Sequence, residues 1–238
     1  MAIQNGFIQI IQDEKRDYQY EEAMKTLRTN IQFSGNGLKV IMLTSAMPDE
    51  GKSETSSQLA ISMAQTEGRV LFIDADIRKS VLVSRFGGGQ QIYGLTQYLT
   101  GQRLLGEVLY HTNLPNLDII FSGPMAPNPA ELLGGKNFRS LLNALRKVYD
   151  YVIVDTPPLG SVIDSAIVAE ICDGSIMVIE SGVISYRFAQ EVKSQLERSN
   201  CPLLGVVLNK VDMQKQAYGK YGKYGQYKYG DYGQEEDD

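Results

Sequence analysis

The sequence predicts an α/β fold built on a doubly wound, mostly parallel sheet flanked by helices on both faces. Short apolar runs recur along the chain and are continuous rather than alternating, which is typical of parallel strands buried on both faces. Segments with helical periodicity separate these runs, and such an alternation implies right-handed crossovers. Ligands of such sheets bind at the carboxyl ends of the strands.

Composition narrows the classes of function. The chain has 238 residues, 43% of them hydrophobic, and a formal net charge of −5. It can bury a sizeable core, and its acidic balance gives no reason to expect nucleic acid as a partner. No apolar run approaches the ~18 to 20 residues of a membrane span, and no signal-peptide pattern opens the sequence, so we expect a cytoplasmic protein.

Cysteine and histidine chemistry has little support. Cys172 and Cys201 lie in apolar surroundings without the spacing of metal ligands, so we expect buried thiols and no zinc site. His111 is the only histidine and is expected in a loop. Acid–base chemistry would therefore fall to carboxylates.

An amphipathic helix is predicted over residues 17–33. Its apolar stripe consists of Ala23, Met24, Leu27 and Ile31. The opposite, solvated face carries Glu22, Lys25 and Arg28. Residues 1–16 show no period.

The central motif is TSAMPDEGKS at residues 44–53, between an apolar run at 38–43 and a small-residue helix at 53–65. A strand, loop and helix in this order favour a polyphosphate, with Lys52 on the β and γ phosphates and Ser53 on Mg²⁺. Gly51 would let the chain approach the phosphates. The general pattern has glycine at the position of Ala46, so an αR-compatible turn must replace the glycine turn. A coincidental match in a surface loop is the alternative, and the preceding strand argues against it.

The nucleotide-binding set contains the loop, its neighbours and one residue from the end of the last strand. It consists of Ala46, Met47, Pro48, Asp49, Glu50, Gly51, Lys52, Ser53, Glu54 and Asn209.

The remaining strands and helices follow from the same patterns. Strands are predicted at 69–74, 117–121, 151–155, 175–179 and 203–208. Helices are predicted at 95–99, 104–109, 130–133, 138–148, 162–171 and 188–196. Glycine-rich residues 87–89 and proline-rich residues 122–129 are predicted turns.

Aspartates stand at the ends of two of these strands, at the same edge as the phosphate loop. In phosphoryl transfer one carboxylate can accept the proton of the attacking hydroxyl while others hold the metal. Asp74 is the candidate base, and Asp76 and Asp155 are the candidate metal-side carboxylates. Asp155 taken alone could equally be a turn or cap residue.

From residue 214 the chain becomes a tract of tyrosine interleaved with Gly, Lys and Gln, so we expect a folded domain over 1–213 and a flexible tail over 214–238. The tail tyrosines are Tyr218, Tyr221, Tyr224, Tyr227, Tyr229 and Tyr232. The tail could be a self-associating aromatic segment, a stacking platform for single-stranded nucleic acid, or a set of phosphate acceptors. A phenol of pKa ~10 needs a base to attack phosphorus at neutral pH.

Together these motifs resemble a bacterial tyrosine kinase of the capsular or exopolysaccharide type, a P-loop NTPase related to the cell-division and chromosome-partitioning ATPases. The resemblance rests on SAMPDEGKS at 45–53 (Walker A), VLFIDADIR at 70–78 (Walker A′) and YVIVDTPP at 151–158 (Walker B). GLTQYLTG at 94–101, SGPMAPNPAELL at 122–133 and the tyrosine cluster add to it.

The resemblance implies a Rossmann-like three-layer fold and an ATP- and Mg²⁺-dependent protein-tyrosine kinase. Lys52 and Asp74 would be catalytic, with Ser53, Asp76 and Asp155 in the metal site. The tail tyrosines would be autophosphorylated, mostly in trans, in the regulation of polysaccharide synthesis and export.

The resemblance also implies partners. Glu22, Lys25 and Arg28 stand where the family has Glu-x-x-Arg-x-x-Arg, a motif for ring-shaped self-association. Lys25 keeps the charge of the middle arginine but lacks its bidentate fork. A membrane-embedded activator whose cytosolic tail docks on the kinase and a cognate phosphotyrosine phosphatase are further expected partners, and the activator would recruit the kinase to the inner face of the membrane.

Two other functions remain open. An ATPase switch of the partitioning type usually carries a second lysine early in Walker A, and residues 45–50 have none. A GTPase would explain Asn209-Lys210-Val211-Asp212, which fits N-K-x-D, but Asp155 is followed by Thr-Pro-Pro without the expected glycine. A non-enzymatic interaction protein would leave Lys52 and the aspartates without a role.

Overall fold

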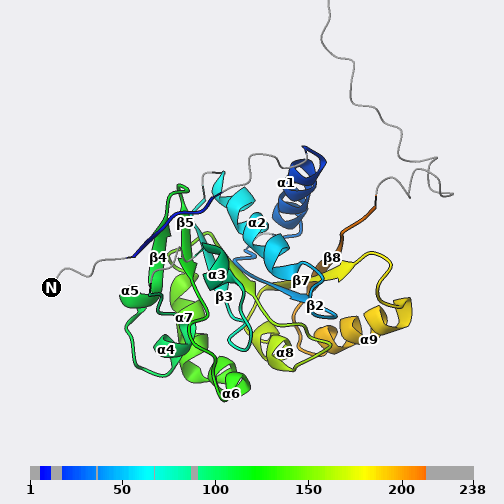
Figure 1. Ribbon diagram of the computed structural model, residues 1–238. Helices are drawn as coiled ribbons and strands as arrows, with labels where there is room; N and C mark the ends of the chain where they lie inside the picture. Colours follow the sequence, from blue (N-terminus) through cyan, green and yellow to red (C-terminus); the bar gives the residue numbers. More distant parts are fainter. Residues whose placement is uncertain (1–5, 12–17, 36, 67, 87–90, 213–238) are drawn as a thin grey trace, which may run out of the picture.

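The computed structural model describes residues 6–11, 18–35, 37–66, 68–86 and 91–212, which form one eight-stranded sheet between two layers of helices (Figure 1). The strands are β1 (Phe7–Ile8), β2 (Val40–Ser45), β3 (Val70–Asp74), β4 (Leu109–Thr112), β5 (Leu117–Ile120), β6 (Tyr151–Asp155), β7 (Gly174–Glu180) and β8 (Leu203–Asn209). Their spatial order is β1-β4-β5-β3-β6-β2-β7-β8, and every pair is parallel except β4 with β5. The predicted doubly wound, mostly parallel sheet is confirmed.

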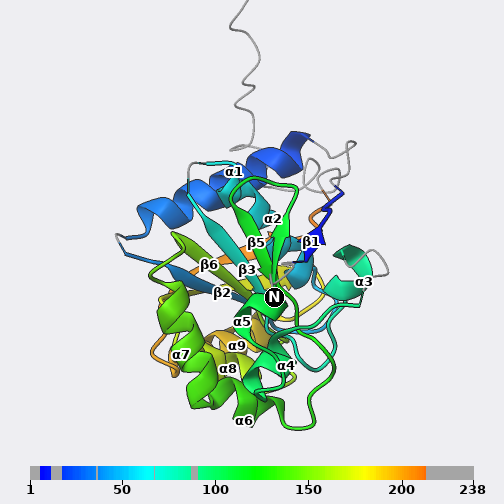
Figure 2. The same cartoon turned by 90° about the vertical axis from the view of Figure 1, so that its left-hand side faces the viewer.

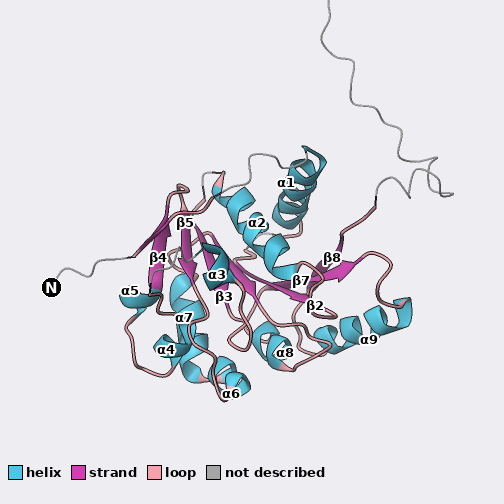
Figure 3. Ribbon diagram, in the orientation of Figure 1, coloured by secondary structure: helices cyan, strands magenta, loops and turns pink. Residues whose placement is uncertain are grey.

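Helices cover both faces of this sheet (Figures 2 and 3). They are α1 (Tyr18–Phe33), α2 (Lys52–Ala64), α3 (Leu82–Phe86), α4 (Leu95–Leu99), α5 (Leu105–Val108), α6 (Pro129–Gly134), α7 (Lys136–Leu145), α8 (Asp164–Ala169) and α9 (Tyr186–Glu197). Helices α1, α2 and α3 pack on one face, and α4 to α9 pack on the other. None of the helices in the described ranges is long and apolar enough to cross a membrane.

The central strands are buried on both faces, as their continuous apolarity predicts. In β2, Val40 and Met42 join the core beneath α4 to α9, whereas Ile41 and Leu43 join the core beneath α1 to α3. Side chains of a strand alternate between faces, so an apolar residue is needed at every position.

Helix α2 is almost entirely buried. Only Ser53 and Glu54 of its residues are partly exposed, since it packs on the sheet below and on α1 above. The small residues Ser56, Ser57, Ala60 and Ala64 allow this double contact, because larger side chains would hold the helix away from the strands.

Two strands were not predicted, and they change the position of His111. Strand β4 forms an antiparallel hairpin with β5, and the two-residue β1 pairs with β4 at His111 and Thr112. His111 therefore lies in a strand, not in a loop as expected. Its Nδ1 is 2.6 Å from Asp118 Oδ1, and Asp118 Oδ2 accepts a hydrogen bond of 2.6 Å from the Tyr149 hydroxyl. Burial, followed by the bond to Asp118, raises the pKa of Tyr149.

The predicted stripe of α1 is correct only in part. Met24 and Ile31 are buried, but Ala23 is exposed. Arg28 was expected on the solvated face and instead lies against α2, where its Nη1 donates to the Ser62 carbonyl oxygen at 2.7 Å. Glu22 and Lys25 do lie on the surface, paired with each other at 2.7 Å. The role of these three charged residues in a ring stays a prediction.

The two thiols agree with the expectation of unreactive core cysteines. Cys201 is buried and Cys172 is half-buried, and both are free. Burial raises the pKa of both, that of Cys201 to about 11, so neither forms a reactive thiolate at neutral pH.

The packing of α2 gives a stability prediction. The Ala60→Leu variant should lower the free energy of unfolding by about 1–3 kcal/mol, because Ala60 is fully buried and the cavity of about 10 Å³ beside it is too small for a leucine side chain. The matched Ala23→Leu change, on the exposed side of α1, should stay within about 0.5 kcal/mol of the wild type. Urea titrations followed by circular dichroism measure both. Equal effects of the two variants would contradict this account of α2.

Candidate active site

The carboxyl ends of β2, β3 and β6 bring the predicted site residues together. Asp155 is paired in register with Leu43 on one side and with Asp74 on the other. The phosphate loop leaves β2 at Ser45 and enters α2 at Lys52, so it lies directly beside both aspartates. This central position in the sheet is the reason the motifs converge.

The loop reverses direction through two left-handed residues. Asp49 has φ 65° and Gly51 has φ 83°. A Cβ atom on Gly51 would lie 2.0 Å from Asn209 Nδ2, an amide that donates to the Glu50 carbonyl oxygen at 2.9 Å. Glycine at 51 is thus required by the close approach of Asn209 as well as by the backbone turn. Asn209 closes the loop from the end of β8.

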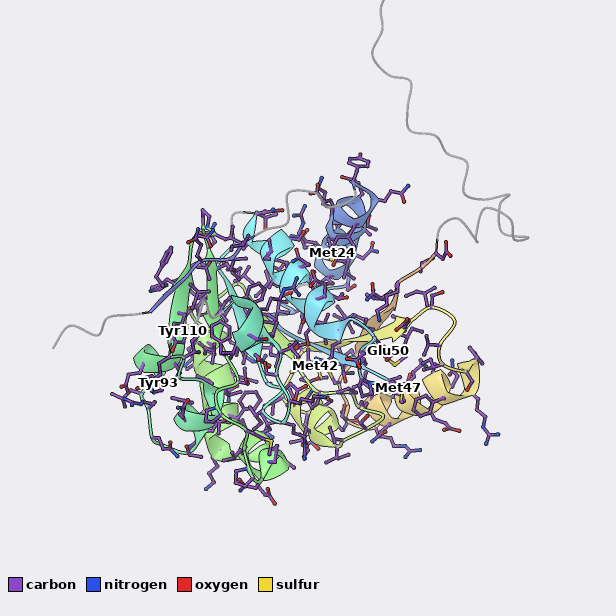
Figure 4. All side chains as sticks on the ribbon, viewed as in Figure 1. Met24, Met42, Met47, Glu50, Tyr93 and Tyr110 are labelled. Atoms are coloured by element: carbon purple, nitrogen blue, oxygen red, sulfur yellow. The ribbon has the colours of Figure 1, made fainter. Side chains whose placement is uncertain are left out.

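Glu50 supports the loop from inside. Its carboxylate is buried, with Oε2 accepting from the Met47 N–H at 2.7 Å and Oε1 from the Glu180 N–H at 3.2 Å. Figure 4 shows Met47 and Glu50 close together beside the ends of β2 and β7. The Glu50 side chain thus binds the loop's own backbone and occupies the Met47 N–H. The place of Glu50 in the nucleotide-binding set stays a prediction.

A second contact that holds the phosphate loop comes from Lys210 at the end of β8, and it was not predicted from the sequence. Lys210 Nζ donates to the Asp49 carbonyl oxygen at 2.7 Å and pairs with Glu180 at 2.8 Å. Lys210 follows Asn209 directly, and in the sequence Lys210 was considered only as part of a guanine-binding motif. The loop is therefore fastened to β7 and β8 by Glu50, Asn209 and Lys210.

The carboxylate of Glu54 forms an ion pair with Arg85 of α3. This pair attaches α3 to the first turn of α2. The place of Glu54 in the nucleotide-binding set stays a prediction.

Lys52 and Asp155 form a buried ion pair at the centre of the site. Lys52 Nζ lies 2.8 Å from Asp155 Oδ1 and 3.0 Å from Ser53 Oγ, and Ser56 Oγ donates to the same Asp155 oxygen at 2.9 Å. Asp155 has no solvent exposure, and its Oδ2 is buried without a hydrogen-bond partner. Unpaired buried oxygens are costly, so this atom marks a place for a further ligand.

These residues fit Mg²⁺. The ion prefers carboxylate and hydroxyl oxygens, and proteins bind it through one or two carboxylates together with substrate phosphates. Asp155 Oδ2, Ser53 Oγ and Asp76 supply such oxygens. Within the described part of the chain no group of three or more His, Cys, Asp or Glu residues could hold a metal by itself, as expected where phosphates complete the coordination.

Asp74 has the properties of a general base. It is fully buried, its Oδ2 accepts a hydrogen bond from Ser80 Oγ, and its Oδ1 accepts one from the Asp76 N–H at 3.2 Å. Burial, then repulsion by Asp155, raises the pKa of Asp74 to about 7, against the opposing effects of Ser80 and Lys52. A carboxylate with a pKa near the working pH is well placed to accept a proton.

Asp76 is held by the turn that follows it. Its Oδ1 accepts from the Arg78 N–H at 3.3 Å and from the Lys79 N–H at 3.0 Å. Arg78 then forms a two-point ion pair with Asp164, at 2.6 and 2.9 Å. Arg78 lies within the Walker A′ segment, so the sequence contained a signal for this anchor, but its partner 86 positions away did not stand out.

The first turn of α8 holds both aspartate loops. Asp164 binds the loop after Asp76 through Arg78, while Ser165 Oγ lies 2.5 Å from the Pro157 carbonyl oxygen and 3.0 Å from Thr156 Oγ1 in the loop after Asp155. Helix α8 thus links the loops that carry the two candidate metal-side carboxylates, Asp76 and Asp155.

The structure therefore brings the phosphate loop, Asp74, Asp76, Asp155 and Asn209 together as predicted. The tail tyrosines Tyr218, Tyr221, Tyr224, Tyr227, Tyr229 and Tyr232 lie outside the described residues. Their role as acceptors stays a prediction.

The Arg78–Asp164 pair yields a stability prediction. Arg78→Ala should lower the free energy of unfolding by about 3–5 kcal/mol, because Asp164 is fully buried and would lose its only described ion-pair partner. Arg187→Ala, whose pair with Glu191 is exposed, should cost at most about 0.5 kcal/mol. Chemical denaturation at pH 7 measures both. A loss below about 1 kcal/mol for Arg78→Ala would show that Asp164 is not held as a buried charge.

Comparison with known proteins agrees with this geometry. The profile of the AAA domain family matches residues 38–198. The tyrosine-protein kinase CpsD of Streptococcus pneumoniae serotype 4 is 46% identical over 199 residues, covering 84% of this chain and 88% of that protein. YwqD, a tyrosine-protein kinase of Bacillus subtilis, is 39% identical over 201 residues, covering 83% of this chain and 84% of that protein. Among solved structures, the kinase domain of the Escherichia coli tyrosine kinase ETK aligns with a TM-score of 0.75 at 30% identity, covering 86% of this chain and 91% of that one. Since such identity extends over most of its length, the chain belongs to the bacterial tyrosine-protein kinases, a family of P-loop proteins.

Proposed function

We propose that this kinase transfers the terminal phosphoryl group of ATP to the tyrosines of its own tail, mostly in trans, and thereby regulates the synthesis and export of a capsular or extracellular polysaccharide. The observation that carries the proposal is a buried carboxylate with a pKa of about 7, Asp74, directly beside the lysine and aspartate of a phosphate loop. Both requirements of tyrosine phosphorylation, a phosphate-binding loop and a base for the phenol, meet at one sheet edge.

The residues divide the work as follows. The loop's N–H groups and Lys52 bind the β and γ phosphates, and Lys52 exchanges its contact with Asp155 for the phosphates. Ser53, Asp76 and Asp155 would hold Mg²⁺, which would supply neutralisation of the phosphate charge. Asp74, positioned by Ser80, accepts the proton of the phenol.

Two features support the tail as the acceptor. Strand β8 ends at Asn209, in contact with the phosphate loop, so the tail leaves the fold at the catalytic edge. Asp74 lies on β3, four strand positions away from β8. At about 4.8 Å per strand spacing, a tail acting on its own subunit has to cross roughly 20 Å of its own nucleotide site. The nine residues from Asn209 to Tyr218 can span this distance at about 3.3 Å per residue, so transfer in trans rests on the resemblance to the family.

Assembly and partners belong to the same proposal, and they rest on the resemblance to the family. Glu22, Lys25 and Arg28 on α1 would contribute to a ring, and Arg28 already links α1 to α2. A membrane-embedded activator would dock its cytosolic tail on the kinase at the inner face of the membrane. Each phosphotyrosine adds about −1.5 to −2 charges, so phosphorylation would loosen the assembly and a phosphotyrosine phosphatase would restore it.

A GTPase is disfavoured by the contacts of the N-K-x-D segment. The Asn209 amide already donates to Glu50, and Lys210 is engaged by Asp49 and Glu180. In this arrangement the segment closes the phosphate loop, so guanine recognition is not needed to explain it.

Direct labelling tests the proposal. The full chain incubated with Mg–ATP should incorporate phosphate at the tail tyrosines, mapped by mass spectrometry. Lys52→Met should lower this labelling by about 10²–10³-fold, because an electrostatic contact to the transferring group is lost. Lys193→Met, which removes an exposed lysine of α9, serves as the matched control. ATP consumption with an unmodified tail, or full labelling by Lys52→Met, would refute the proposal.

The pKa of Asp74 predicts the pH dependence of transfer. Below pH 7 the carboxyl of Asp74 is protonated and cannot accept the phenol proton, so kcat/KM should rise with pH through about 7 and then level off. Asp74→Asn should lose most of the rate together with this rise. Initial rates of tail labelling between about pH 5.5 and 9, at constant ionic strength, measure the profile. A rate already maximal at the acidic limit would remove Asp74 from the role of base.

A further inference from the structure

A cavity of about 430 Å³ lies beside Asp76, between the segment after β3 and the loop after β5. We propose that this cavity is the subsite for the acceptor tyrosine, with Met125 at its mouth and Lys79 on its rim. The inference deepens the proposed function, on which it rests, by naming where the ring binds and which flanking residues are preferred. Its volume is within the range of small-ligand pockets, about 300–1,000 Å³.

The order of strands places the cavity on the side from which an acceptor must arrive. The nucleotide-binding residues extend from Asn209 on β8 across the loop after β2, and they end at Asp155 on β6. Transfer proceeds with the attacking and leaving oxygens roughly in line, so the acceptor approaches opposite the leaving ADP. The next strands in that direction are β3 and β5, whose following loops form the cavity.

The lining of the cavity suits a phenol. Val83, Ile92, Pro124 and Met125 give apolar surface for the ring. Asp76 and Ser80 lie on the side of the base, because Ser80 binds Asp74 directly. Asp74 itself is fully buried behind this side of the cavity, and Ser80 connects the two.

One wall of the cavity is preformed. A Cβ atom on Gly94 would lie 2.2 Å from the Gly123 nitrogen, and Gly123 has φ +79°, so the two glycines allow the segments before α4 and after β5 to touch. Backbone bonds from Leu95 to Phe121 at 2.7 Å and from Thr96 to Ser122 at 2.9 Å fasten them. A rigid wall lowers the entropic cost of holding the ring.

Lys79 makes the subsite prefer acceptor tyrosines that have acidic neighbours in the sequence. Its backbone N–H binds Asp76, whereas its exposed ammonium has no hydrogen bond or ion pair to any described residue. A cation at the rim attracts acidic residues that flank the acceptor. In the tail, Tyr232 stands in GDYGQEEDD and Tyr221 in GKYGK, so Lys79 favours Tyr232.

The transfer step at this subsite forms one bond to phosphorus and breaks another. The phenolic oxygen of the acceptor forms a bond to the γ-phosphorus while the bond from that phosphorus to the β–γ bridging oxygen breaks. ADP leaves with this oxygen. The phenol proton passes to the carboxylate of Asp74, and the products are a phosphotyrosine, ADP and the protonated base.

Peptide kinetics with the full-length chain test the subsite. Met125→Glu should raise the KM for a peptide of residues 230–238 by about tenfold, with kcat nearly unchanged, because it places a carboxylate against the ring. Met125 is 77% exposed, so the variant should fold. The matched control, Val148→Glu, is 51% exposed and follows α7 at the opposite edge of the sheet. It should leave KM unchanged, and the affinity of both variants for a fluorescent ATP analogue should equal that of the wild type.

A comparison of two tail peptides tests the preference for acidic neighbours. The wild type should favour the peptide of residues 230–238 over that of residues 219–223 in kcat/KM, and Lys79→Met should reduce this ratio by about threefold, as expected for one exposed charge pair. A wild type that labels its tail while Met125→Glu keeps the normal peptide KM would overturn the subsite alone. An unchanged ratio in Lys79→Met would overturn the charge preference. A wild type that labels no tyrosine would overturn the proposed function itself.

Discussion

The buried pair of Lys52 and Asp155 is the interaction on which the site depends. Asp74, Asp76 and Asp155 crowd one sheet edge, and two of them have no solvent exposure. Isolated buried charges are very costly, so Lys52, the one lysine of the described residues that hydrogen-bonds to these carboxylates, determines how they share charge. Asp155 takes that lysine together with a hydroxyl from Ser56. Asp74, left with a hydroxyl but no cation in contact, has a pKa of about 7. The base and the metal-side carboxylate therefore differ because their partners differ.

This division of charge also explains why the structure is compatible with a nucleotide. Bound phosphates would compete with Asp155 for Lys52. The second oxygen of Asp155, which has no hydrogen-bond partner among the described residues, would then be available to a divalent cation. Asp74 makes no direct bond to Lys52, so its hydrogen bond to Ser80 can persist throughout. Asp74 can therefore keep its position when Lys52 and Asp155 exchange their contact for bound phosphates.

The sequence predicted the features that depend on a few neighbouring residues. The apolar runs of β2, β3 and β6 identified buried parallel strands, and the convergence of their carboxyl ends placed Lys52 with the aspartates. The errors concern contacts between distant segments. Arg28 and Ser62 are 34 positions apart, and β1 pairs with a strand about a hundred residues later. Periodicity on α1 could not show that Arg28 faces α2, because an arginine has the same pattern on a solvated face and on a helix contact. The side-chain partners of Glu50 and Glu54, the loop backbone and Arg85, were not predicted for the same reason.

The contacts that hold the loops of Asp76 and Asp155 set the geometry of the site. Reacting atoms must be held about 3–3.5 Å apart for efficient transfer, and small displacements are costly in rate. Loops after strands are the most mobile parts of such folds, so two independent loops would allow the two metal-side carboxylates, Asp76 and Asp155, to drift apart. Here both loops are attached to the first turn of α8, through Asp164 to Arg78 and through Ser165 to Pro157. Because one short helix holds both, a movement of α8 shifts Asp76 and Asp155 together. The spacing that phosphoryl transfer needs is thereby set by a single packed element rather than by the loops themselves.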